Sequence, residues 1–87
     1  MAVQTPITNS TVNSISGDQR LHLAKFSSVG NNDTYLAPVA VINAISAEAG
    51  NTATVGVTWV NAANGATITF AIASGPATNV TMSVLGF

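Results

Sequence analysis

Side chains able to carry out acid–base chemistry or to bind a metal are few in this chain. Two are basic, three are acidic and one is a histidine. They are Asp18, Arg20, His22, Lys25, Asp33 and Glu48. Catalysis and metal binding both need several such groups to converge on one point. A serine nucleophile would also need a base and a third group that orients the base, and the chain offers one histidine for that role.

His22 and Asp18 are the nearest candidates for a catalytic pair. Four residues of a strand span more than about 10 Å, so these two side chains would meet only if the chain turned between them. We therefore expect no enzymatic activity, no cofactor and no metal site. We expect His22 to lie at the surface or in an interface.

The scarcity of charge is the most informative feature of the composition. Charged residues make up 6% of the chain, against roughly 25% in an ordinary soluble domain. Ser, Thr and Asn take their place, and these groups are easier to desolvate than ions and can pair with backbone groups across an interface. Such a surface indicates a chain that is buried against other protein. A secreted, neutral, Thr-rich domain is the alternative.

The composition also excludes several classes of function. With two basic residues and a net charge of −1, the chain cannot neutralise many phosphates, so we expect no binding to nucleic acid. The longest apolar run, residues 36–42, contains Pro38 and is shorter than the roughly 18 residues of a spanning helix, so we expect no membrane insertion. A chain of 87 residues without cysteine holds one small domain that depends on packing and partners for stability.

Alternating apolar and polar residues predict β-strands in the first half of the chain. Residues 20–26 alternate with Leu21 and Leu23 on the face opposite His22, and a break in the pattern at residues 25–26 indicates a bulge. Residues 39–47 are rich in β-branched side chains, which favours a strand over the short helix that their alanines would also allow.

The clearest pattern is a hairpin in the second half. Residues 54–59 and 67–72 both alternate, and the Asn64-Gly65 pair between them predicts a two-residue type I′ turn. A turn at residues 74–76 then leads to a last strand at residues 80–85. Five or six short strands separated by turns predict one all-β domain over residues 17–87, a small antiparallel β-sandwich or barrel.

Residues 1–16 show no sustained period of 2 or 3.6 and contain a proline, which predicts an extended N-terminal arm. Four apolar residues are spaced along it, and we expect them to contact a capsid or a neighbouring subunit. They are Val3, Ile7, Val12 and Ile15. A frayed terminus is the alternative.

Tyr35 and Trp59 are possible interface aromatics, because a large ring with a polar group can anchor a protein contact or stack on a sugar. A single Trp on an alternating strand more often fills the core.

Four stretches of the chain carry a resemblance to a known family. They are residues 24–29 (AKFSSV), residues 32–35 (NDTY), residues 73–81 (ASGPATNVT) and the pair Gly86-Phe87. Over roughly residues 20–87 the chain resembles short phage-encoded β proteins from the head genes. The resemblance implies a capsid cement or decoration protein, a small β-domain that often forms trimers and clamps neighbouring major capsid proteins from outside. It implies a place on the capsid surface of the virion, with the major capsid protein and further copies of itself, as a homotrimer, for partners.

Two other functions fit the same sequence. One is a carbohydrate- or receptor-binding module of a phage fibre or spike, with Tyr35 and Trp59 as its platform. The other is a tail-tube or pilus-like structural subunit, which would assemble into filaments.

Overall fold

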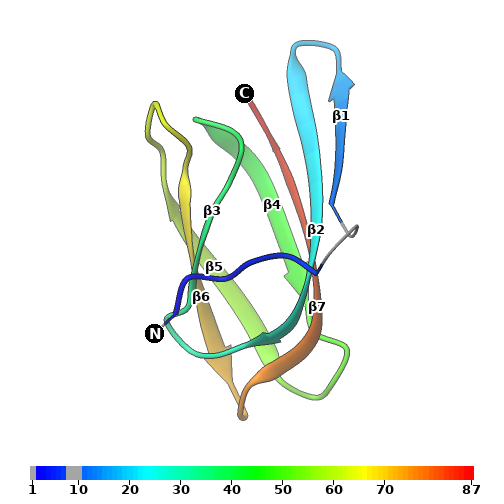
Figure 1. The fold of residues 1–87 in the computed structure, drawn as a ribbon, viewed down its shortest axis with the longest axis vertical. Helices are drawn as coiled ribbons and strands as arrows, with labels where there is room; N and C mark the ends of the chain where they lie inside the picture. Colours follow the sequence, from blue (N-terminus) through cyan, green and yellow to red (C-terminus); the bar gives the residue numbers. More distant parts are fainter. Residues whose placement is uncertain (1, 8–10) are drawn as a thin grey trace.

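The computed structural model describes residues 2–7 and 11–87, and within them the chain forms seven β-strands. The strands are β1 (Val12–Ser16), β2 (Gln19–Val29), β3 (Thr34–Leu36), β4 (Ile42–Glu48), β5 (Thr54–Val60), β6 (Thr67–Ala73) and β7 (Ala77–Gly86). Four strands form one sheet in the order β1-β2-β7-β4, and three form the other in the order β3-β6-β5 (Figure 1). All strand pairs are antiparallel. The predicted all-β sandwich is confirmed, and it is open at its sides and not a closed barrel.

The long pairing between β2 and β7 forms the centre of the four-stranded sheet. Val80, Met82 and Val84 alternate along β7 and are fully buried. They pair with Phe26, Ala24 and His22 of β2, in that order. The inner face of this sheet is therefore built from matched buried residues on its two central strands, as cross-strand pairing requires.

This pairing corrects two predictions about β2. His22, Ala24 and Phe26 face the core, so His22 does not lie at the surface as expected, and Leu21 and Leu23 lie on the opposite, outer face as the alternation predicts. Phe26 is larger than either leucine. Because it lies four residues after His22 on the strand, the two side chains are on the same face, and burying Phe26 also turns His22 inward. With this orientation the alternation is regular through residues 25–26, and the pairing shows no bulge there.

The predicted hairpin of β5 and β6 is confirmed, but its turn is different. Val60 pairs with Thr67, so residues 61–66 form a longer loop. Gly65 has a φ of +123°, whereas Asn64 does not have the positive φ that a type I′ turn requires. Tertiary contacts determine this geometry, because a Cβ at Gly65 would lie 2.6 Å from the carbonyl oxygen of Ala37. The backbone N–H of Ala66 also donates to the carbonyl oxygen of Val39, and the carbonyl oxygen of Ala66 accepts a bond from the N–H of Ala37.

The strand predicted over residues 39–47 is confirmed as β4, which starts at Ile42 and ends at Glu48. Residues 37–41 instead form an irregular segment that crosses one end of the sandwich. Its backbone forms three hydrogen bonds with the 61–66 loop, at Ala62 and Ala66, and two with Phe87. The register shifts between Ile42 and Ala44, where the chain enters the sheet.

The N-terminal region differs from the predicted arm of residues 1–16. Val12–Ser16 form β1, which pairs with β2 through the tight turn at Gly17 and Asp18, where Gly17 has a φ of +62°. This turn was expected as the start of the domain, but the sheet already begins at Val12. Residues 2–7 lie outside both sheets and cross one open side of the sandwich, from β3 to β2 (Figure 1). The predicted arm residues 1 and 8–10 lie outside the described residues.

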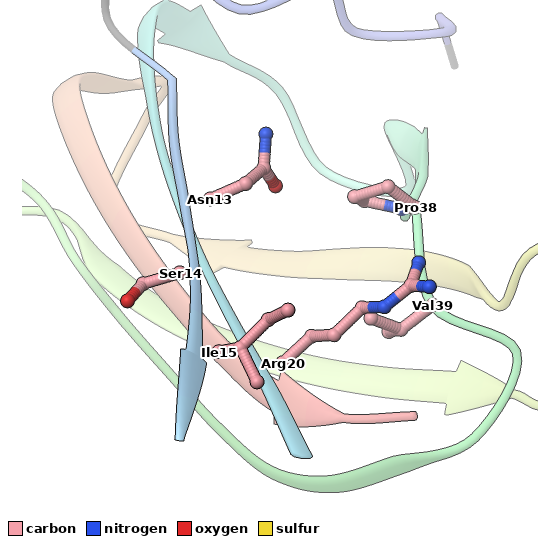
Figure 2. A pocket seen from close by; sticks show the side chains of 6 residues that line it. All are labelled: Asn13, Ser14, Ile15, Arg20, Pro38 and Val39. Carbon is pink, nitrogen blue, oxygen red and sulfur yellow. The ribbon is translucent and has the colours of Figure 1, made fainter. Parts of the chain in front are cut away.

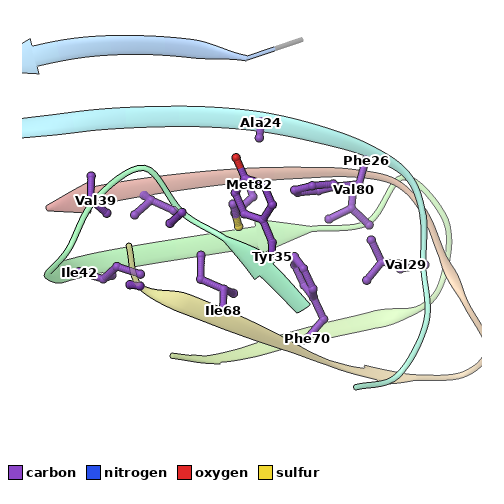
Figure 3. Close-up of a cluster of buried hydrophobic side chains, with 14 residues drawn as sticks. Ala24, Phe26, Val29, Tyr35, Val39, Ile42, Ile68, Phe70, Val80 and Met82 are labelled. Atoms are coloured by element: carbon purple, nitrogen blue, oxygen red, sulfur yellow. The ribbon is translucent and has the colours of Figure 1, made fainter. Parts of the chain in front are cut away.

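The core lies between the two sheets and is formed by apolar side chains from both (Figure 3). Phe26 is at its centre, with its ring 5.1 Å from that of Tyr35 and 5.6 Å from that of Phe70. Both contacts are edge-on, the geometry that aromatic pairs prefer. These rings join β2 of one sheet to β3 and β6 of the other, which fixes how the sheets are stacked.

Candidate functional site

β1 lies at the free end of the four-stranded sheet. It pairs with β2 on one side and has no strand on the other. Its described side chains, those of residues 12–15, are all exposed, so neither face of β1 is covered by the opposite sheet. Successive residues of an antiparallel strand direct their backbone groups alternately to either side. About half of the N–H and C=O groups of β1 therefore point away from the protein, where a further strand can bind them.

An open groove runs beside β1, with a volume of about 580 Å³. Asn13, Ser14 and Ile15 form one wall, and Pro38 and Val39 form the other. Figure 2 shows the Arg20 side chain extending from β2 across this groove toward Pro38 and Val39.

A second hollow continues from the groove along the same end of the molecule. It shares Arg20, Pro38 and Val39 with the groove and reaches the 61–66 loop and Phe87. The apolar side chains of Ile15 and Phe87 are exposed at this end.

Arg20 is the cation of this groove, and no described residue forms an ion pair with it. Its neighbour across the strands is Ile15, which is 77% exposed. A guanidinium group presents several N–H donors in a plane and suits a carboxylate better than any other protein group. The groove therefore combines apolar walls with one cation that lacks a counter-ion within the described chain.

A buried hydrogen-bonded chain lies behind the groove. His22 is 3% exposed. Its Nδ1 atom lies 2.7 Å from Oδ1 of Asn13, and its Nε2 atom lies 2.8 Å from the hydroxyl oxygen of Tyr35. Burial lowers the pKa of His22 and raises that of the Tyr35 hydroxyl, so both are neutral at pH 7. In the neutral form Nδ1–H donates to Asn13 and the Tyr35 hydroxyl donates to Nε2.

This arrangement corrects the expectation that His22 lies at the surface or in an interface. It also leaves the side-chain NH₂ of Asn13 directed away from His22, because the amide oxygen is the atom that bonds the ring. Two side chains that line the groove, Arg20 and Asn13, thus present hydrogen-bond donors.

Asp33 is the second polar centre, and it holds the N-terminal segment in place. Its Oδ1 atom accepts a bond from the backbone N–H of Ala2 at 2.8 Å, and its Oδ2 atom accepts bonds from the Gln4 side chain at 2.6 Å and the Gly30 N–H at 2.8 Å. The bond from Gly30 is the main reason that the pKa of Asp33 is lowered, and the bonds from Gln4 and Ala2 act in the same direction, against the effect of burial. A parallel bridge between Val3 and Thr34 completes the attachment.

The four predicted arm residues are all exposed. Val3 is 79% exposed, Ile7 42%, Val12 52% and Ile15 77%. They lie in two places, because Val3 and Ile7 belong to the segment of residues 2–7 and the other two belong to β1.

The two predicted interface aromatics lie on either side of Ile68. Tyr35 of β3 and Trp59 of β5 both pair with Ile68 of β6, so the three side chains form a row across the inner face of the three-stranded sheet. Tyr35 is buried and is not available to a partner, which corrects its proposed role. Trp59 lies on β5, at the edge of its sheet, and is 38% exposed, outside the buried core cluster.

The groove and the position of Arg20 in it were not evident from the sequence. One signal was present, because Arg20 is one of only two basic residues in the chain. Its position facing Pro38 and Val39 depends on the path of residues 37–41, which no local pattern predicts.

No protein-family model, curated protein or solved structure matches this chain. Within residues 2–7 and 11–87 there is no cluster of three His, Cys, Asp or Glu residues that could hold a metal ion. The same residues contain no helix that could cross a membrane.

Proposed function

We propose that this protein is a non-enzymatic cement or decoration subunit of a viral capsid, which binds the outside of the shell and stabilises contacts between major capsid proteins. The observation that carries the proposal is the exposure of the four apolar side chains of residues 2–7 and β1, on a molecule whose surface has few charges. Burying such side chains against a partner stabilises a complex, whereas leaving them in water contributes nothing.

The physical role follows from where the exposed groups lie. The segment of residues 2–7 crosses from β3 to β2, where Ile7 bonds Lys25 two residues from the partner of Val12 in β1, so the exposed groups form one extended contact surface (Figure 1). A subunit that contacts two neighbours at once resists their separation. When many copies bind the assembled shell and not the free capsid subunit, they stabilise the shell by mass action. Trimer formation, which the family resemblance favours, would multiply these contacts.

The fold does not favour the rival function of a carbohydrate-binding tip with Tyr35 and Trp59 as its platform. Tyr35 is buried against Phe26 and bonded to His22, so it cannot stack on a sugar. Copy number separates the remaining possibilities. A cement protein is present in many copies per particle and a spike tip in a few, and a tail-tube subunit assembles into filaments by itself.

The direct test is co-sedimentation of the purified protein with shells assembled from the major capsid protein of the same virus. We expect the wild-type chain to pellet with the shells. Deleting residues 1–16 is unsuitable, because it would remove β1 and uncover β2. The double substitution Val3→Ser and Ile7→Ser keeps the backbone bonds of the segment and removes its exposed apolar groups.

We expect this double variant to bind the shells more weakly, since each buried aliphatic side chain contributes about 1.5–3 kcal/mol. Val60→Ser is the control, because Val60 is also an exposed aliphatic residue, at 71%, but lies at the end of β5. Failure of the wild-type chain to bind shells at all would reject the proposed function.

A further inference from the structure

We propose that the free edge of β1 and the groove beside it receive an extended segment of the partner protein, which pairs with β1 as an added strand and places a carboxylate against Arg20. This inference rests on the proposed function, since it identifies the part of the decoration subunit that binds the shell protein and the chemistry that the shell protein must supply.

The first reason is the unprotected state of this edge. Proteins usually guard edge strands with charged residues, prolines or bulges, because an open edge pairs with other strands. β1 has the sequence VNSIS and contains none of these. The edge of β4, by comparison, has a register shift near Ile42 and a charged residue at Glu48. Residues 2–4 partly cover the edge of β3 through their bonds to Thr34.

The position of β1 is the second reason. The edges of β4 and β5 lie close together on the other side of the sandwich, where each restricts access to the other. β1 has no neighbour of this kind within the described chain, and its outer edge faces solvent (Figure 1). An added strand can therefore approach β1 without displacing any described part of the protein.

The third reason is charge complementarity, which identifies the kind of segment that fits. Apolar side chains of the incoming strand would pack on Ile15, Pro38 and Val39. The Arg20 guanidinium in the groove has no ion pair within the described chain, and the Asn13 NH₂ is also directed away from its buried partner. Donors without acceptors favour an anion, so the segment should carry an Asp or Glu next to an aliphatic residue.

The test uses two substitutions that each make the net charge of −1 more negative by one unit. Arg20→Gln removes the cation and keeps a shorter polar side chain that can still form a hydrogen bond. Thr58→Glu is the matched control, because it adds an anion at an exposed position of β5, on the other sheet. Binding of each variant to shells of the major capsid protein is measured by co-sedimentation over a range of protein concentrations.

We expect Arg20→Gln to weaken binding at least about tenfold, the effect of losing one strong charge-assisted hydrogen bond, while Thr58→Glu binds like the wild type. The inference would be overturned if the Arg20→Gln variant bound shells as tightly as the wild type, or if both substitutions weakened binding equally. Either result would leave the proposed function standing. If the wild-type chain itself does not bind shells, the proposed function fails and the inference fails with it.

Amide hydrogen exchange provides a second, independent measurement of the added strand. Residues 12–16 should exchange more slowly in the shell-bound protein than in the free protein, because an added strand bonds the outward N–H groups of β1. The amides of β5 serve as the internal reference and should not change. Protection confined to residues 2–7 would place the contact elsewhere and overturn the inference even if Arg20→Gln weakens binding.

Discussion

His22 in β2 and Tyr35 in β3 are joined across the two sheets, with 2.8 Å between Nε2 of the imidazole and the tyrosine hydroxyl. The two rings are nearly parallel, with their centres 6.0 Å apart. Because the other ring nitrogen bonds Asn13 of β1, one buried side chain connects three strands. The protonation state of His22 therefore affects both the stacking of the sheets and the support of the edge strand.

The first prediction concerns pH. Burial lowers the pKa of His22 in the folded protein below its usual value of 6.5. At pH values between the lowered pKa of the folded protein and the usual pKa of the unfolded chain, the unfolded chain binds more protons than the folded one. The free energy of unfolding therefore falls as the pH is lowered. We expect it to be constant above about pH 7.5 and to decrease from there toward about pH 5. Denaturant titrations across this range would measure the change.

His22→Gln provides the control for this prediction. Glutamine can still form hydrogen bonds but does not titrate, so this variant should be less stable at every pH and its stability should not change between about pH 8 and about pH 5. A pH dependence as steep as that of the wild type would show that another group is responsible.

The second prediction concerns the attachment of residues 2–7. Asp33→Asn replaces one of the two acceptor oxygens with an NH₂ group that faces other donors. We expect the free energy of unfolding to fall by about 1–3 kcal/mol. Amide exchange in residues 2–4 should become faster, because these residues depend on Asp33 and Thr34 for their bonds. Asp18→Asn, the same change at the exposed β1–β2 turn, should leave exchange in these residues as it is in the wild type.

Asp33 also predicts acid sensitivity in a range separate from that of His22. Its pKa in the folded protein lies below the usual value of 3.8. The stability that the carboxylate contributes is fully present above that value and is lost as the pH falls through the lowered pKa. Wild-type protein should lose its N-terminal attachment on acidification below about pH 3.8, whereas Asp33→Asn should show no further change there.

The third prediction concerns the core. Phe26 is fully buried and its ring contacts those of Tyr35 and Phe70. Phe26→Ala should destabilise the protein by about 3–5 kcal/mol, which is a large part of the total stability of a domain this small. Phe87→Ala is the matched control, since Phe87 is exposed, and should change stability by less than about 0.5 kcal/mol. Thermal unfolding followed by circular dichroism would measure both variants.

The fourth prediction compares two glycines in strands. A Cβ at Gly86 would collide with the carbonyl oxygen of Val41, which is backbone and cannot move aside easily. Gly86→Ala should therefore destabilise the protein by about 1–3 kcal/mol. A Cβ at Gly56 would meet its nearest atom, the Ala71 carbonyl oxygen, at 3.8 Å, an ordinary contact. Gly56→Ala should be neutral or slightly stabilising. Equal losses in both variants would show that crowding at Gly86 is not the cause.

The parts of the fold that were predictable from the sequence are those that depend on local alternation. β5, β6 and the end of β7 were located within a few residues, because each has one apolar face and lies between turn residues. The orientation of β2 was not predictable in this way. Leu21 and Leu23 alternate along one face, and the residues that are buried alternate along the other. Which of the two faces is turned toward the core depends on pairing with β7, which is distant in sequence.

The candidate site was predictable only in part. The exposure of the four apolar residues among the first sixteen positions agrees with the contact role predicted for them, which stays a prediction, but the pairing of β1 with β2 has no signal in the local pattern. Neither was the groove, because it requires Arg20 and Pro38 to meet across the end of the sandwich. Tyr35 was misassigned because a tyrosine in a short strand next to a turn has no local signal that distinguishes a buried ring from an exposed one.

The position of β7 in its sheet has a consequence for how the chain folds. β7 is the last strand along the sequence, yet it lies between β2 and β4 and hydrogen-bonds both of them. The larger sheet therefore cannot close during synthesis until residues 77–86 have left the ribosome. Such distant pairings form slowly, so a ribosome-bound chain lacking this segment should remain a substrate for chaperones and proteases.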